Sequence, residues 1–168
     1  MADGRDRFVI QQHDATTLHY DFRLEVDGTL RSWAVPKGPS PDPAEKRLAV
    51  EVGDHDLDYG DFEGIAGGGR GSGAVIVWDA GTYRNLDEER SMADALAAGH
   101  AKFWLEGEKL RGGWTLHRTG DGRGPKTQWL LIKRRDEHAE AGRDPQRAEP
   151  ASVRSGRTIE QVAEQEGG

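Results

Sequence analysis

The sequence predicts a mostly β protein, built as an antiparallel sandwich or barrel, and three observations support this. Apolar and polar residues alternate with a period of two in short stretches, turn-forming residues recur about every 8–12 positions, and only one segment of the body has a helical pattern. At 168 residues the chain suits one domain that buries a core without disulfides. It contains no Cys, which excludes thiolate metal sites.

About eight short strands are expected, each bounded by turn-forming residues. They are predicted at residues 7–13, 18–26, 29–35, 47–52, 74–79 (continued by 82–83 beyond a break near Gly81), 102–106, 109–117 and 128–133. Asp27-Gly28 is the strongest hairpin signal and pairs the second strand with the third. The prolines at 36–43 exclude a strand interior there and predict a rigid surface connection, and residues 54–59 are predicted to be a polar loop.

The one helix expected in the body spans residues 91–99, because Ser91 and Asp94 have the spacing of a capping box and Gly99 can end the helix. The glycine-rich stretch at 64–73 could cradle a phosphate. Neither a Gly-Lys-Ser/Thr sequence nor a helical pattern follows it, so a tightly turning loop is favoured over a nucleotide-binding loop.

Composition divides the chain into a barrel domain at 1–135 and a polar, disordered tail at 136–168. The tail contains 8 of the acidic and 4 of the basic residues, whereas the body contains 22 and 19, so most of the net charge of −7 comes from the tail. A brief helix at 158–165 would have only Ile159 and Val162 to bury, which is too little to hold it. The positive and negative charges of the body nearly cancel, so a polyanion could bind only at a local basic patch.

No apolar run approaches the roughly 20 residues of a membrane span, and the first seven residues lack the apolar core of a signal peptide. We therefore expect a cytoplasmic protein without a membrane partner.

The predicted strand at 18–26 alternates without a break, and the other strands are expected to assemble around it. Leu18, Tyr20, Phe22, Leu24 and Val26 share the face that should pack into the core. The other face presents His19, Asp21, Arg23 and Glu25. Such a face is most often simply solvated, but this one also has the groups to bind a metal ion and a phosphate side by side.

A metal site can be built around that strand. His13 ends the preceding strand across a short turn from His19, and Asp21 lies about 7 Å further along the same face. Two imidazoles and one carboxylate can hold one side of a metal, and this donor set favours Mn, Fe, Co or Zn over Mg or Ca. Arg23 would then reach an anion at the metal, with bidentate geometry that suits phosphate or carboxylate.

Seven motifs follow one another along the chain: FVIQQHDA (8–15), LHYDFRLE (18–25), SWAVPKGPS (32–40), KRLAVEV (46–52), DHDLDY (54–59), DFEG (61–64) and VIVWD (75–79). Together with shorter matches at 107–110 and 129–133, they resemble the 3′-phosphoesterase module of bacterial DNA ligase D over about residues 7–135.

The resemblance implies a compact β-barrel with a polar active-site crater and a Mn²⁺-dependent activity, with Co²⁺ and Zn²⁺ as alternative metals. That activity removes a terminal ribonucleoside from a DNA 3′ end and then hydrolyses the remaining 3′-phosphate during break repair. By position, His13, His19 and Asp21 match the metal ligands of the family. Arg23, Arg47, His55 and Tyr59 match its phosphate-contacting and catalytic residues, and Gln11 and Lys37 match supporting polar residues. The partners implied are DNA 3′ ends, the ligase, polymerase and Ku of end joining, and the protein is expected to be a monomer.

His55 could protonate the leaving oxygen or complete the metal–phosphate cluster, and the sequence leaves both roles open. His100, His117 and His138 match no family position and are expected to be structural or solvated. Only Arg5 and Arg7 precede the first strand where many relatives have a longer basic arm, so the 3′-phosphatase step is the less certain one. Relatives often carry an acid at the position of Gly53 and an aromatic residue near Arg70. Without a polymerase or ligase domain, this is a stand-alone form or an excised domain.

Two alternatives remain at this stage. A non-catalytic β-barrel that grips DNA or RNA ends would need a basic, aromatic-lined groove more than a metal triad. A non-haem iron oxygenase would use the same two His and one carboxylate.

Overall fold

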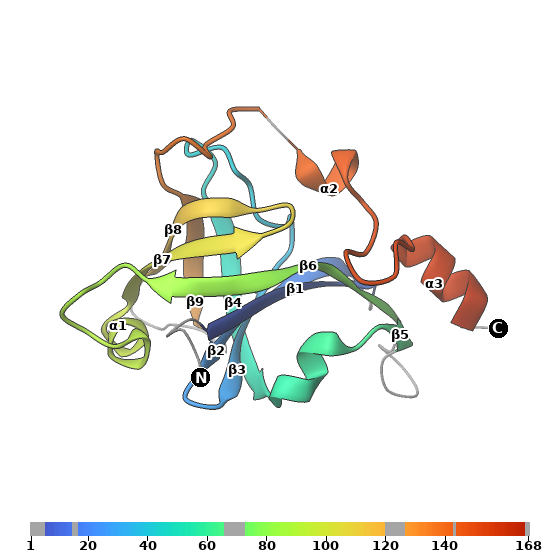
Figure 1. The fold of residues 1–168 in the computed structure, drawn as a ribbon, viewed down its shortest axis with the longest axis horizontal. Helices are drawn as coiled ribbons and strands as arrows, with labels where there is room; N and C mark the ends of the chain where they lie inside the picture. The colour runs from blue at the N-terminus through green and yellow to red at the C-terminus, as the bar shows by residue number, and fades with distance from the viewer. Residues whose placement is uncertain (1–5, 15–16, 66–72, 120–126, 143, 167–168) are drawn as a thin grey trace.

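A computed structural model describes residues 6–14, 17–65, 73–119, 127–142 and 144–166 of the 168-residue chain (Figure 1). The strands are β1 (Asp6–Asp14), β2 (Leu18–Val26), β3 (Thr29–Val35), β4 (Arg47–His55), β5 (Gly64–Ile65), β6 (Ala74–Asn85), β7 (His100–Gly107), β8 (Arg111–Arg118) and β9 (Gln128–Lys133). The helices are the 3-10 helix η1 (Leu57–Asp61) and the α-helices α1 (Met92–Ala98), α2 (Pro145–Ala148) and α3 (Ile159–Glu166). None of the helices in these ranges is long and apolar enough to cross a membrane.

Eight strands close into an antiparallel barrel, in the order β1-β2-β3-β4-β9-β8-β7-β6, with β6 pairing back onto β1. The short strand β5 adds a two-residue pairing to β6. The predicted mostly β fold is therefore confirmed as a closed barrel rather than a sandwich. Because the barrel closes, each of the eight strands has a neighbour on both sides, and backbone groups are left unpaired only where a neighbouring strand is short.

The barrel interior is filled by large aromatic and aliphatic side chains. Four tryptophans there are almost completely buried, at 0–1% exposure: Trp33, Trp78, Trp114 and Trp129. On β2 the core face is formed by Tyr20, Phe22, Leu24 and Val26. Leu18, which was predicted to share that face, is 42% exposed because it lies at the strand end beyond the core.

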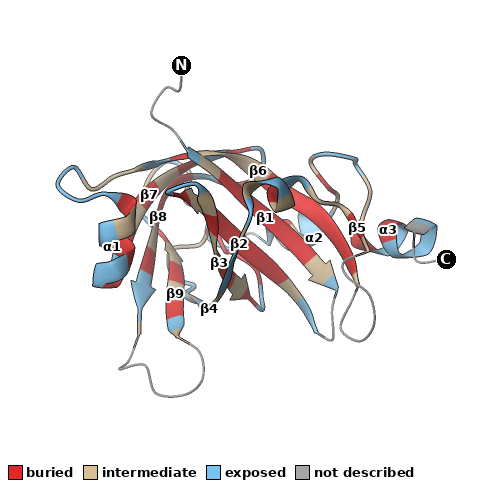
Figure 2. Cartoon of the chain, turned by 90° about the horizontal axis from the view of Figure 1, so that it is seen from below, coloured by how far each residue is buried: buried red, intermediate tan, exposed pale blue. Residues whose placement is uncertain are grey.

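The opposite face of β2 is not solvated, since Asp21 and Arg23 are 6% and 2% exposed. The buried parts of β1, β2 and β6 run side by side in Figure 2. These strands therefore have buried side chains on both faces, one inside the barrel and one under η1 and the C-terminal segment.

Local signals placed several elements correctly. The hairpin turn has positive φ at Asp27 (51°) and Gly28 (82°), as a two-residue type I′ turn requires. The side chain of Ser91 accepts a hydrogen bond from the backbone N–H of Asp94, and Gly99 ends α1 in the left-handed conformation.

Other elements are longer than predicted. Strand β4 continues to His55, within the stretch expected to be a loop, and η1 follows. Strand β6 continues through Gly81 instead of breaking there. A Cβ atom on Gly81 would collide with the carbonyl of Glu106, so glycine at this position allows β6 and β7 to approach closely. Of the glycine-rich stretch, positions 66–72 lie outside the described residues.

The segment after residue 135 departs most from expectation. It contains α2 and α3, and Ile159 and Val162 are 4% and 0% exposed, packed with Ala74 and Ile76 of β6. The expectation that these two side chains bury too little to hold a helix is wrong, because β6 offers them a matching apolar surface. The division of the chain into domains at residue 135 stays a prediction.

Candidate active site

Two histidines and one aspartate meet where β1 and β2 are joined. His13 and His19 lie directly opposite each other in the antiparallel register, and Asp21 lies two residues further along β2. One ligand atom from each of the three residues falls within 4.8 Å of the other two. His19 Nε2 is 3.2 Å from Asp21 Oδ1, and His13 Nδ1 is 3.8 Å from Asp21 Oδ2. All three project from the side of the strands opposite to the core residues Tyr20 and Phe22.

The surroundings of this cluster keep Asp21 ionised. Burial alone would raise the pKa of Asp21, but the imidazoles of His13 and His19 and the charge of Arg23 outweigh burial and hold that pKa well below its ordinary value. His19 Nδ1 lies 2.9 Å from the carbonyl of Thr17, so Nδ1–H can donate to this carbonyl, and Nε2, 3.2 Å from Asp21 Oδ1, is the nitrogen that faces the cluster.

The donor set fits a divalent transition metal. Two imidazole nitrogens and a carboxylate are the mixed ligation that such ions accept while keeping positions open. His13 Nε2 is buried, and within the described ranges it has no hydrogen-bond partner. Burying an imidazole nitrogen without a hydrogen-bond partner costs free energy unless another group, such as a metal ion, binds that nitrogen.

Arg23 is at the centre of a buried hydrogen-bond network beside this cluster. Its Nε donates to Gln11 Oε1 at 2.7 Å, Nη1 donates to Ser32 Oγ at 2.7 Å, and Nη2 donates to Asp21 Oδ2 at 3.3 Å. Nη1 also lies 3.0 Å from His55 Nδ1. A guanidinium has five N–H groups, so these contacts leave one on Nη2. Arg23 therefore links Asp21 to His55.

His55 and Tyr59 complete the network from the other side. The guanidinium carbon of Arg23 lies 5.0 Å from the centre of the Tyr59 ring, and that ring stacks on His55 at 4.7 Å. Burial and the nearby charge of Arg23 lower the pKa of His55, so its imidazole is neutral at neutral pH. Because an Arg23 N–H points at Nδ1, the hydrogen of the neutral ring belongs on Nε2.

In the part of the chain that the structure describes, two of the predicted site residues do not contact this network. Arg47 begins β4 and pairs with Glu45 at 3.4 Å. Lys37 is exposed in the connection after β3. The structure thus unites His13, His19, Asp21, Arg23, His55, Tyr59 and Gln11, and it leaves Arg47 and Lys37 apart from them.

Sequence reasoning missed two residues of this site. Ser32 is 1% exposed and accepts the Arg23 hydrogen bond described above. Its position follows from the hairpin, because the Asp27-Gly28 turn sets Arg23 opposite Ser32, so the signal was present. Phe62 stacks on Tyr59, and only its closeness in sequence to Tyr59 indicated a role.

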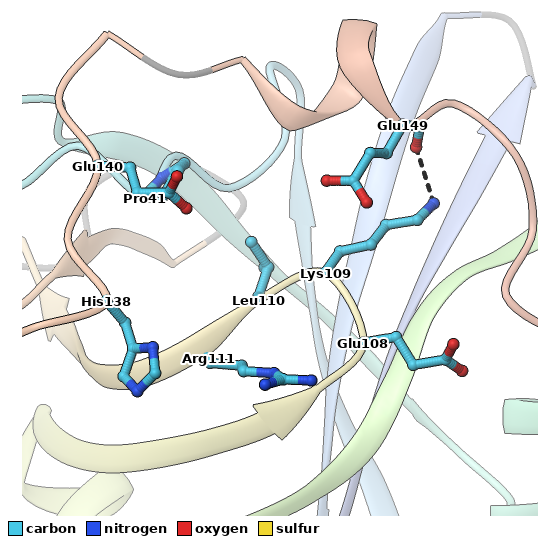
Figure 3. A pocket seen from close by; sticks show the side chains of 8 residues that line it. All are labelled: Pro41, Glu108, Lys109, Leu110, Arg111, His138, Glu140 and Glu149. Carbon is cyan, nitrogen blue, oxygen red and sulfur yellow. Dashed lines mark hydrogen bonds between the residues drawn. The ribbon is translucent and has the colours of Figure 1, made fainter.

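A separate pocket of about 230 Å³ lies where the β7–β8 turn meets the C-terminal segment (Figure 3). It is lined by Pro41, Glu108, Lys109, Leu110, Arg111, His138, Glu140 and Glu149. The Lys109 ammonium donates to the backbone carbonyl of Glu149 at 2.8 Å, shown dashed in Figure 3. None of the predicted site residues lines this pocket, and its hydrogen bond joins the tail to the barrel.

Comparison with known proteins identifies the family of this chain. The sequence model of the DNA Ligase D 3′-phosphoesterase domain matches residues 11–118. The multifunctional non-homologous end joining protein LigD of Pseudomonas aeruginosa is 54% identical over 159 residues, which is 93% of this chain and 18% of that protein. The LigD proteins of Mycobacterium tuberculosis and Mycolicibacterium smegmatis are 45% and 40% identical, over 72% and 80% of this chain. The chain spans less than a fifth of the length of each of these relatives.

Proposed function

Because the chain belongs to the DNA ligase D 3′-phosphoesterase family, we propose that it is a metal-dependent hydrolase that prepares DNA 3′ ends for non-homologous end joining. Its substrates would be a 3′-terminal ribonucleoside, removed by phosphodiester hydrolysis, and the 3′-phosphate that remains. The ligase, polymerase and Ku components of end joining are the proposed partners. The observation that carries the proposal is the convergence of His13, His19 and Asp21 beside the Arg23–His55–Tyr59 network.

His13, His19 and Asp21 would hold the metal, with Mn²⁺ as the preferred ion and Co²⁺ or Zn²⁺ as alternatives. The ion would supply Lewis-acid stabilisation of the negative charge on the phosphate. The backbone carbonyl of Thr17 orients the His19 ring, and Arg23 orients Asp21, so each of these two side chains has a protein partner that would hold it toward the metal.

His55 is placed to contact the phosphate ester through Nε2. With Nδ1 facing Arg23, the neutral ring keeps its hydrogen on Nε2, and this N–H can donate a hydrogen bond to the leaving oxygen as negative charge develops on it. Tyr59 stacks on the imidazole and fixes its plane, and the guanidinium of Arg23 adds positive charge that favours the developing negative charge on phosphate. Gln11 holds the guanidinium in place, because its Oε1 accepts the hydrogen bond from Arg23 Nε. Lys37, which is exposed, would contact the DNA backbone together with Arg47.

The test uses 3′-labelled primer-templates that end in a ribonucleoside or in a 3′-phosphate. Parallel reactions would contain Mn²⁺, Co²⁺, Zn²⁺, Mg²⁺, Fe²⁺ with oxygen, or a chelator. Hydrolysis that requires Mn²⁺ or a related ion supports the proposal. Binding without turnover that ignores the chelator would favour an end-binding module, and turnover that needs Fe²⁺ and oxygen would favour an oxygenase.

Removal of a ligand gives the first prediction. His19→Ala or Asp21→Asn should lower turnover well beyond the roughly 10–100-fold typical of residues that only support a ligand. Mn²⁺ affinity, measured by calorimetry, should fall in parallel. His117→Ala on β8, an exposed histidine outside the cluster, is the matched control and should leave both unchanged. If either ligand variant keeps more than about a tenth of the wild-type rate at saturating Mn²⁺, the ligand assignment is wrong.

A further inference from the structure

Three aromatic rings form a column that leads away from Arg23. The His55 and Tyr59 rings are 4.7 Å apart and inclined at 28°, and the Tyr59 and Phe62 rings are 5.5 Å apart and inclined at 12°. All three side chains are half-buried, so the column lies at the protein surface. We propose that Phe62 is the stacking platform for the terminal nucleoside of the DNA 3′ end, a proposal that rests on the proposed function.

The column is fixed relative to the metal ligands. The Gln11 amide nitrogen donates to the backbone carbonyls of Tyr59 at 2.8 Å and Phe62 at 3.2 Å, while its oxygen accepts the hydrogen bond from Arg23. Gln11 is completely buried. One side chain therefore connects the guanidinium beside Asp21 to the backbone that carries Phe62, which pre-organises the ring for binding.

Two arginines lie next to Phe62. Asp61, the preceding residue, accepts hydrogen bonds from Arg7 at 3.1 Å and from Arg154 at 2.9 Å, both on Oδ1. These two cations offset the charge of Asp61, while Glu63, the following residue, is bonded to the N–H of Val77 and to Ser152. Basic groups that meet the backbone, next to aromatic rings on which bases stack, are the usual means of binding single strands and ends.

The two proposed substrates differ at the place where the platform would act. In the diester the terminal ribonucleoside lies beyond the scissile phosphate, whereas the 3′-phosphate end has no nucleoside there. A stacking platform therefore affects binding of the diester alone. A ring that only supported Tyr59 would affect hydrolysis of both substrates.

The experiment compares Phe62→Leu, Phe62→Tyr and wild type on the two substrates. Phe62→Leu should raise KM for the ribonucleoside-ended DNA roughly 5- to 100-fold, with KM and kcat for the 3′-phosphate end unchanged. Phe62→Tyr keeps a ring face and should retain the wild-type KM. Trp104→Leu on β7, a half-buried aromatic residue outside the site, is the control and should alter neither substrate. Equal losses on both substrates, or no loss on either, would overturn the proposal.

A second readout does not depend on turnover. With a chelator present, DNA that ends in a 2-aminopurine ribonucleoside is titrated with protein, and the fluorescence of the base is followed. Stacking on Phe62 should quench it, and Phe62→Leu should abolish the quench while Phe62→Tyr keeps it. A quench that persists in Phe62→Leu would overturn the platform. If wild type hydrolyses neither substrate, the proposed function fails, and the quench alone decides whether Phe62 binds the nucleoside.

Discussion

At the scale of single residues, Arg23 shows best how burial changes an inferred role. Its place beside His19 and Asp21 predicted a guanidinium that grips phosphate with two N–H donors. In the structure Arg23 is 2% exposed, and four of its five N–H groups face Gln11, Ser32, His55 and Asp21. It can offer phosphate one N–H and its charge, and its geometry is that of a residue that positions its neighbours.

The substitution Arg23→Lys tests this role. Lysine keeps the charge but cannot reach four partners in one plane, so buried acceptors such as Gln11 Oε1 lose their donor. We expect a loss of about 1–3 kcal/mol in the free energy of unfolding. Turnover should fall more than tenfold because His55 and Asp21 lose their orientation. Urea unfolding and kinetics at saturating Mn²⁺ measure the two effects.

Arg31→Lys provides the control for Arg23→Lys, because Arg31 lies on β3 in partly exposed ion pairs with Glu51 and Asp54. Such pairs contribute at most about 1 kcal/mol, so stability and turnover should change little. A collapse of turnover in Arg23→Lys, with stability and metal affinity both intact, would restore the direct phosphate grip as the main role of Arg23.

The clustering of two histidines and one aspartate could be predicted from sequence because strand periodicity and one short turn determine their placement. His13 and His19 face each other across that turn, and Asp21 follows on the same side of β2. The contact of His55 with Arg23 joins residues 32 positions apart and depends on how β4 and η1 fold over β2. No local pattern specifies such a contact, so the resemblance to a family carried that part of the prediction.

At the scale of elements, the same division between local and long-range causes holds. The β2–β3 hairpin and α1 were predicted at their correct positions because a turn dipeptide and a capping serine specify them. Strand β6 was predicted to end near Gly81 and to continue at residues 82–83, and an isolated glycine does weaken a strand. Pairing of Gly81 with Phe8 of β1 on one side and Gly107 of β7 on the other keeps the strand continuous.

The turn between β7 and β8 is held by a buried side chain from another strand. Asp79 of β6 is completely buried, and its carboxylate accepts hydrogen bonds from the backbone N–H groups of Ala80, Glu108, Lys109 and Leu110. Burial raises the pKa of Asp79, although these four donors oppose the rise. The carboxylate acts as the acceptor that the turn itself lacks.

Asp79→Asn should therefore destabilise the barrel while leaving the candidate site intact. The asparagine oxygen can keep the three donors on Oδ1, but its NH₂ group would face the N–H of Leu110, which leaves a buried donor without an acceptor. We expect a cost of about 1–3 kcal/mol in the free energy of unfolding. Glu108→Gln, an exposed change in the same turn, is the control for denaturant melts. An unchanged midpoint for Asp79→Asn would show that the turn holds without this carboxylate.

At the scale of the whole molecule, the C-terminal segment packs against the barrel. The N–H of Val153 donates to the carbonyl of Val77, and Glu63 accepts from the N–H of Val77. On this side of β6, β5 pairs only with residues 74–75 and β7 only from Gly81 onward. The segment and Glu63 thus satisfy backbone groups that the short neighbouring strands leave unpaired.

Composition could not predict this docking, since it counts apolar residues without regard to what they meet. The segment has few apolar side chains, but Ile159 and Val162 fit against Ala74 and Ile76. Polar contacts add to them, because the indole N–H of Trp78 donates to the carbonyl of Glu149 at 2.9 Å, and the Lys109 ammonium lies 4.4 Å from the centre of the Trp78 ring. A polar segment can therefore be ordered by a surface that lies elsewhere in the chain.

A protein shortened to end at Glu140 tests the role of the segment. Burial of Ile159 and Val162 is worth about 1.5–3 kcal/mol each, and loss of the segment also exposes Ile76. The two side chains together account for about 3–6 kcal/mol. Because 1 kcal/mol corresponds to about 2–4 °C in a domain of this size, we expect the shortened protein to melt about 6–24 °C lower than full length. A protein ending at Glu166, which removes only the last two residues, should melt like full length, and Val162→Ala should fall between the two. If ending at Glu140 leaves the melting temperature unchanged, the segment does not stay docked in solution, and the expectation of a disordered tail stands.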